Sequence, residues 1–269
     1  PRTTPRTPMS PHFTRFPPFA ALLLAWPAVA TAPVTARYRI DQTLTQEVDA
    51  TAAGQGKQSI TFSTSSFVTV TLADTAGGRT VHVVVDSMRG DSANPIPASV
   101  MDSARGAAYH AFLSSAGRLD QLQPMTDVPA ASQVQGLLSD FYPWVRAGLK
   151  VGQSWADTTT RTTIGGPDTV TVRRITLYRA AASETRDKRK AVRIISDFTS
   201  TVDGTQTTPR GSARINGTST GSGTYYVTPD GQYLGGEWQL RSALHLAGAF
   251  APEPLPITLS QTIRVTTLK

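Results

Sequence analysis

The sequence contains no cysteine, so a structural disulfide, a thiolate-bound zinc ion, an iron–sulfur cluster and a thiol nucleophile are all excluded. Charged residues make up only 17% of the chain and apolar residues 39%, a balance too apolar for intrinsic disorder. Aromatic residues are also sparse, at 7%. A chain of 269 residues with this composition can build a hydrophobic core without disulfides, and we expect a soluble globular fold.

Long apolar runs are missing as well. The run Phe19–Trp26 is about half the roughly 20 residues that a membrane-spanning helix needs. It follows Arg15 and precedes an Ala-Val-Ala site ending at Ala30, the arrangement of a secretory signal peptide. We therefore predict that residues 1–30 are an export signal, with an upstream extension before Met9. Because no cysteine follows to carry a lipid, we expect a periplasmic or extracellular protein that is not lipid-anchored.

The excess of positive charge is modest once this segment is set aside. The whole chain has 26 basic and 19 acidic residues, and removing three arginines within 1–30 leaves 23 against 19, a net charge of +4. The remaining arginines are scattered through strand-like segments, so we expect no nucleic-acid binding. The basic run 186–193 is interpreted as a solvated hairpin tip, and the alternative is contact with an anionic membrane surface.

Alternating apolar and polar residues, rich in threonine and valine, predict long antiparallel strands. Glycine, proline and aspartate clusters separate these segments, as in hairpins. Within 169–179 the parity of the apolar residues changes, which predicts a β-bulge near Arg173 and Arg174. The glycine-rich segment 217–223 predicts a turn or bulge. A hairpin is predicted at 109–122, with its turn at 114–117. The predicted single strands lie at 38–48, 60–72, 79–88, 154–163, 169–179, 191–201, 211–218, 223–227, 232–246 and 257–268.

Two segments between the strands have a different period: 99–105 predicts a short helix capped by Ser99, and the segment from Ala130 is the stronger case. Apolar residues from Val134 to Phe141 recur at i, i+3, i+4 and i+7, and Pro143 then ends the pattern. We predict a helical insertion at about 130–142 within a single β-rich domain of residues 31–269. The predicted fold class is mainly β with minor α: long antiparallel strands in a strongly curved sheet, an open or half β-barrel, with the central helix packed on it.

No arrangement of residues predicts chemistry. His82, His110 and His245 are far apart in sequence and lack the spacing of metal ligands. The segment 152–156 fails the nucleophile-elbow pattern at its final glycine, and no lysine follows the glycines at 217–223 as in a phosphate loop. We therefore expect no catalytic residues, no metal, no cofactor and no enzymatic activity.

The order of elements resembles a known group of proteins. A signal peptide, long antiparallel strands, a helical insertion and further strands together resemble the lipoprotein-carrier superfamily of the LolA, LolB and LppX type. The segments LKVGQSW at 149–155 and GSGTYYVTPDGQYLG at 221–235 are similar to those of secreted bacterial β-proteins. The resemblance implies a curved half-barrel closed by helices over an apolar cavity, although the predicted helical content is lower than that of the carriers. It assigns no site residue.

A curved sheet that is not fully closed has a concave apolar face, which suits apolar ligands. We therefore expect a non-enzymatic exported protein that holds a hydrophobic small molecule, a lipid or acyl chain, by apolar burial. Plain core packing is the alternative role for each large apolar residue. The residues expected to line or edge the cavity are Ile60, Phe62, Val83, Phe112, Phe141, Trp144, Trp155 and Trp238.

Two other functions remain open. The sheet could serve as an interaction or scaffold module that docks another envelope protein and has no small ligand. Strands near ten residues with alternating character are also typical of an outer-membrane barrel. The sparse aromatic residues and the threonine- and arginine-rich strand faces argue against such a barrel.

Overall fold

The computed structural model describes residues 32–51, 54–125, 129–138, 140–165, 168–208, 211–248 and 253–269. The chain divides into two units, Pro1–Ala30 and Thr31–Lys269. The predicted export signal at 1–30 lies outside the described residues. Every described strand and helix therefore belongs to the second unit.

The described residues form long strands with two short helices. All the strands join one antiparallel 11-stranded sheet in the order β5-β4-β3-β2-β1-β11-β10-β9-β8-β7-β6, which confirms the prediction of a mainly β fold. The last strand pairs with both β1 and β10, so the two ends of the domain meet in the middle of the sheet. The elements are β1 (Val34–Ala50), β2 (Gly56–Thr75), β3 (Gly78–Gly90), α1 (Ala98–Ser103), β4 (Ala108–Ser114), β5 (Gln123–Pro124), α2 (Pro129–Leu138), β6 (Ser154–Gly165), β7 (Asp168–Arg186), β8 (Arg189–Thr208), β9 (Gly211–Val227), β10 (Tyr233–Gly248) and β11 (Leu255–Leu268).

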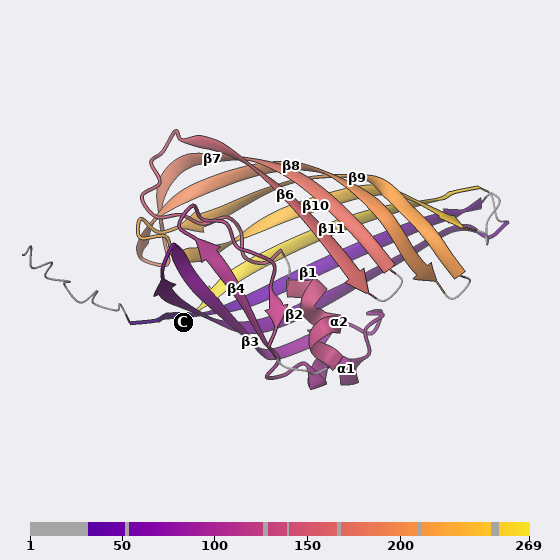
Figure 1. Ribbon diagram of the computed structural model, residues 1–269, viewed down its shortest axis with the longest axis horizontal. Coiled ribbons are helices and arrows are strands. Elements are labelled where there is room, and N and C mark those ends of the chain that lie inside the picture. The colour runs from indigo at the N-terminus through magenta and orange to yellow at the C-terminus, as the bar shows by residue number, and fades with distance from the viewer. Residues whose placement is uncertain are drawn as a thin grey trace, which may run out of the picture. The chain divides into compact units, whose positions relative to one another are not determined.

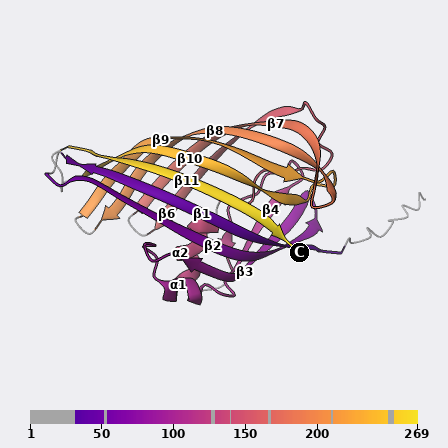
Figure 2. The ribbon, with the colours of Figure 1, turned by 180° about the vertical axis from the view of Figure 1, so that it is seen from behind.

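The sheet curls around one of its faces, and its edge strands β5 and β6 do not pair with each other (Figures 1 and 2). Long strands accumulate right-handed twist, which favours this coiling. We call the face that carries Tyr38, Ile40 and their register partners the inner face. The opposite, outer face is polar: on it, the hydroxyl oxygens of Thr45 and Thr61 lie 2.9 Å apart across β1 and β2. The alternation in the sequence therefore separates an apolar inner face from a hydroxyl-rich outer face.

Both helices lie along one side of the curled sheet, and α2 packs on its inner face (Figure 1). The hydroxyl of Tyr109 donates a hydrogen bond to the carbonyl of Ala131 at 2.7 Å. The Gln42 amide donates to the carbonyl of Leu137 at 2.5 Å. These bonds tie α2 to β4 and β1, on either side of β2 and β3. The helix ends at Leu138. Its main-chain carbonyls accept hydrogen bonds from side chains of the sheet, while its apolar residues are buried against the inner face.

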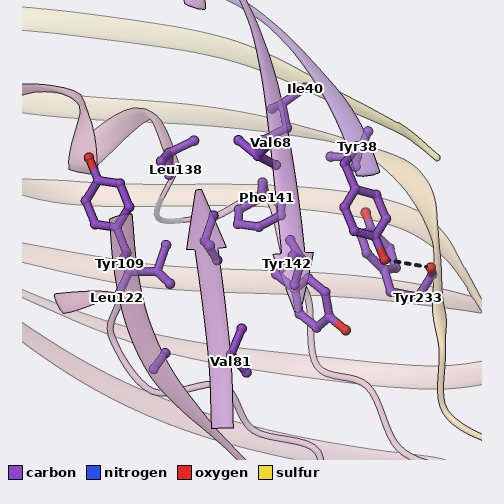
Figure 3. Close-up of a cluster of buried hydrophobic side chains, with 14 of the residues drawn as sticks. Tyr38, Ile40, Val68, Val81, Tyr109, Leu122, Leu138, Phe141, Tyr142 and Tyr233 are labelled. Carbon is purple, nitrogen blue, oxygen red and sulfur yellow. Dashed lines mark hydrogen bonds between the residues drawn. The ribbon is translucent and has the colours of Figure 1, made fainter. Parts of the chain in front are cut away.

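An aromatic cluster fills the core between α2 and the sheet (Figure 3). Tyr38 and Tyr233 stack with ring centroids 5.5 Å apart, and Phe141 and Tyr142 meet Tyr38 edge to face. The Tyr38 hydroxyl donates to the main-chain carbonyl of Tyr233 at 3.0 Å. This cluster links β1, β10 and the segment after α2, elements that are far apart in the sequence.

The predicted bulge near Arg173 and Arg174 is wrong. The pairing of β7 with β8 is continuous through this region, and its register shifts only between Ala180 and Ala182. The change of apolar parity instead places Ile175 and Leu177 on the outer face, where they are 40% and 58% exposed. The prediction assumed that all apolar residues of this strand lie on the buried face, whereas these two face solvent.

The predicted break at 217–223 is also wrong, because β9 runs unbroken through these glycines. A Cβ atom at Gly221 would lie 2.3 Å from the Phe198 ring, and one at Gly223 would lie 2.6 Å from the Trp238 side chain. The glycines leave room for large side chains of the two neighbouring strands. In this strand, glycine therefore serves packing of the inner face rather than a turn.

Candidate functional site

The inner face carries a pocket of about 110 Å³ between strands β6 to β10 and the segments that follow β4 and α2. Strand alternation brings one residue in two from each strand toward it. The lining is both aromatic and charged. It includes Arg118, Asp140, Tyr142, Trp144, Asp157, Arg161, Arg174, Tyr178, Phe198, Tyr225 and Trp238.

Stacked rings form one wall of the pocket. The rings of Trp144 and Trp155 lie 4.4 Å apart, and Trp155 stacks on Tyr178 at 5.3 Å with an interplanar angle of 12°. Trp155 and Tyr178 are direct register partners on β6 and β7, so the stack follows from strand pairing. The buried indole N–H of Trp155 has no hydrogen-bond partner among the described residues. Such a wall presents flat apolar surface to a bound molecule.

A charged cluster stands beside this wall. Asp140 accepts from Arg174 at 3.1 Å and from Arg161 at 3.4 Å. Burial alone would raise the pKa of the Asp140 carboxyl, but the two guanidinium groups outweigh it and hold that pKa below its usual value. Arg174 also lies over the ring of Phe198, with its central carbon 4.6 Å from the ring centroid. The charged side chains that line the pocket are three arginines and two aspartates, so the lining carries a net charge of +1.

A second ion pair, between Arg118 and Asp157, closes the pocket at the unpaired edge. Asp157 lies on edge strand β6, and Arg118 lies in the segment after β4, near the other edge. The hydrogen bond to Asp157 and its charge raise the pKa of Arg118. The Val145 amide donates to the carbonyl of Gly117 at 2.9 Å, which joins the segment after α2 to the segment after β4.

Two phenol groups in the lining have unused hydrogen-bonding capacity. Tyr142 is 6% exposed and Tyr225 is 1% exposed, and in the described part of the chain neither hydroxyl has a hydrogen-bond partner. Burial raises the pKa of both side chains, so both stay neutral and able to donate. Buried hydroxyls of this kind are normally satisfied, and a bound acceptor atom would satisfy them.

Three of the residues predicted from sequence meet at this pocket. Trp144 and Trp238 line it, and Trp155 stacks behind Trp144. Val83 and Phe141 are instead fully buried in the core under α2.

The other predicted residues lie elsewhere. Ile60 and Phe62 are on the inner face near the start of β2, in register with Gln46 and Leu44 of β1. Phe112 is on the outer face of β4, opposite Thr80.

The charged half of the pocket was missed by sequence reasoning. Its signal was present, because Asp157 and Arg161 share the parity of Trp155 along β6, and Arg174 shares the parity of Tyr178 along β7. From the sequence alone, the arginines are interpreted as scattered, so no charged cluster is predicted on this face. Asp140 lies in the segment after α2, and its contact with Arg161 and Arg174 could not be predicted without the tertiary structure.

The basic run lies at the β7–β8 turn, as a hairpin tip. Several of its cations are engaged by neighbours: Arg186 packs over the ring of Tyr226 at 4.3 Å, and Arg189 donates to Gln232 at 2.8 Å. Contact with an anionic membrane surface would therefore depend mainly on the exposed Lys188 and the other lysine of the tip.

Two histidines that are distant in sequence face each other. His82 and His110 are register partners on the outer faces of β3 and β4. Within the part of the chain that the structure describes, however, no group of three or more potential metal-ligating side chains is found. Among the same residues, neither helix has the length and apolar character needed to traverse a bilayer.

Comparison with known proteins adds little. No protein-family model matches the sequence, and no curated protein matches it. Among solved structures, DynF from the dynemicin biosynthesis pathway of Micromonospora chersina is 9% identical over 88% of this chain and 82% of that chain, with a TM-score of 0.20. A loop-deletion mutant of OmpT, an outer membrane protein of Vibrio cholerae, is 7% identical over 87% of this chain and 100% of that chain, with a TM-score of 0.16. These TM-scores are too low to support an assignment of fold or function.

Proposed function

We propose that this is an exported, non-enzymatic protein that holds a lipid or acyl chain on the inner face of an open half-barrel. The observation that carries the proposal is the partial exposure of apolar side chains on the inner face beyond the pocket. Several apolar side chains there stay only half-buried, because α2 covers the other part of the sheet. In the same region, Ser242 and Leu244 of β10 are buried. The half-buried apolar side chains include Leu44, Phe62, Val172, Val202, Leu240 and Leu259.

The dimensions suit one acyl chain. Along β10, the inner-face positions from Leu240 to Leu246 are six residue steps apart, or about 20 Å at roughly 3.3 Å per residue. A single acyl chain occupies half of a bilayer core, about 15 Å of the roughly 30 Å thickness. Burial of about 25 cal/mol for each Å² of apolar surface would supply the binding free energy.

Native mass spectrometry of the full chain, followed by organic extraction and lipid analysis, tests this proposal. We expect a lipid that co-purifies at close to one molecule per chain, and uptake of a fluorescent fatty acid by the extracted protein. A mass of the protein alone, together with no uptake, would exclude the proposed function.

A pair of variants separates specific binding from adsorption. Leu259→Gln places a polar group on the inner face, where Leu259 pairs with Gln46 and Ser242. Ser260→Gln introduces the same amide side chain at the adjacent exposed position on the outer face. We expect the first to weaken fatty-acid uptake and the second to leave it unchanged.

A second function, docking of another envelope protein, is favoured by a different surface. Ile175 and Leu177 stand exposed side by side on the outer face of β7, next to edge strand β6. Exposed apolar residues beside an unpaired strand edge suit a protein partner. Crosslinking in the envelope with a photoreactive residue at 177 would identify such a partner, and the absence of any crosslink would remove this alternative.

A further inference from the structure

The pocket is too small to enclose a whole lipid. Its volume of about 110 Å³ is well below the roughly 300 Å³ at which pockets begin to enclose a drug-sized ligand. It nevertheless adjoins the apolar inner face, because Trp238 of the lining and Leu240 occupy successive inner-face positions on β10. A small polar group could occupy the pocket while an attached chain follows the strand.

The polar groups in the pocket fit an acceptor with a single negative charge. Tyr142 and Tyr225 line the pocket and offer buried hydroxyls without partners in the described structure. The charged side chains that line the pocket are the cations Arg118, Arg161 and Arg174 and the anions Asp140 and Asp157. Their net charge of +1 matches a carboxylate, whereas a phosphate monoester carries about −1.5 to −2 at neutral pH.

We propose that this pocket binds the carboxylate of a single-chain fatty acid, with Arg174, Tyr142 and Tyr225 as its donors and the chain lying along β10 toward Leu246. The inference rests on the proposed function and specifies its ligand class.

Calorimetric titration of the full chain with dodecanoate, methyl dodecanoate and butyrate tests the assignment. Dodecanoate and its methyl ester differ only in charge and hydrogen bonding at the head, so we expect the acid to bind at least tenfold more tightly. Butyrate should bind weakly, because it lacks most of the apolar chain.

Arg174→Gln should reduce the preference for the acid over the ester to nearly one. Arg173→Gln removes the same charge from the neighbouring outer-face position and should leave that preference unchanged. The urea midpoint of each variant checks its fold.

If Arg174→Gln does not fold, Tyr225→Phe is the second variant, since it removes only a hydroxyl with no partner in the described structure. We expect it to weaken dodecanoate binding by about tenfold, with Tyr226→Phe on the outer face as its control.

The possible failures are distinguishable. Equal affinity of the native protein for the acid and the ester would overturn the carboxylate assignment and leave the proposed function standing. Absence of binding by both long-chain compounds would overturn the proposed function itself. Loss of the preference in Arg173→Gln as well as in Arg174→Gln would show that net charge, not the pocket, selects the acid.

Discussion

Two buried tyrosines that stack on each other should respond in opposite ways to loss of their hydroxyls. Tyr38 and Tyr233 are both fully buried, with ring centroids 5.5 Å apart. The hydroxyl of Tyr38 donates to the carbonyl of Tyr233 at 3.0 Å, whereas the hydroxyl of Tyr233 has no partner in the described structure. Replacement of either residue by phenylalanine keeps the ring and changes only this hydrogen bonding.

The expected magnitudes follow from that difference. Tyr38→Phe loses a hydrogen bond and leaves a buried carbonyl without this donor, so the free energy of unfolding should fall by about 1–2 kcal/mol. Tyr233→Phe removes a buried hydroxyl that is desolvated without compensation, so the same free energy should stay constant or rise by up to about 1 kcal/mol.

Equilibrium unfolding in urea, followed by tryptophan fluorescence and by circular dichroism, measures both variants against the native chain. Coincident transitions from the two probes would establish that a single free energy describes each variant. Equal losses for Tyr38→Phe and Tyr233→Phe would refute the reasoning, because they would show that the hydrogen bond does not distinguish the two rings.

Three further predictions concern stability. Phe141→Ala should lower the free energy of unfolding by about 3–5 kcal/mol in urea titration, because it empties the centre of the core; a loss below about 1 kcal/mol would contradict that placement. Gly221→Ala should lower the melting temperature, since its Cβ would lie 2.3 Å from the Phe198 ring and 2.4 Å from the Gln239 carbonyl oxygen; an unchanged temperature would contradict this packing. Burial raises the pKa of Tyr109 to about 12, above its unfolded value of about 10. Its contribution to stability is complete below pH 10 and is lost between pH 10 and 12, by up to about 1.4 kcal/mol per pH unit, and Tyr109→Phe should make this pH slope shallower.

The core under α2 and the pocket adjoin at Tyr142, which packs against Tyr38 and also lines the pocket. The core under α2 is filled by Tyr38, Tyr109 and Phe141, whose hydroxyls or rings are used in packing. The pocket under Trp144 and Trp238 keeps donors that the described protein atoms do not satisfy. A ligand that binds only the folded state would raise the melting temperature, so added dodecanoate should stabilise the native chain.

The sequence by itself determined the kind of secondary structure and the character of each strand face. Alternation with a period of two depends on neighbouring residues along one strand, so the polarity of Thr43 and Thr45 against Leu44 could be assigned without knowing their partners. The alternation pattern gave wrong predictions where apolar residues face solvent or where glycines lie within a strand. Ile175 and Leu177 imitate a buried face, and the glycines around Gly221 imitate a turn.

The tertiary structure decided which strands meet and therefore what the pocket contains. Placement of β11 between β1 and β10, the pairing of His82 with His110, and the shared use of Asp140 by Arg161 and Arg174 all join residues distant in the chain. Local spacing says nothing about such contacts, because they depend on strand order, register and sheet curvature. For this reason the strands could be predicted from the sequence, whereas the charged pocket could be recognised only once the sheet had curled around it.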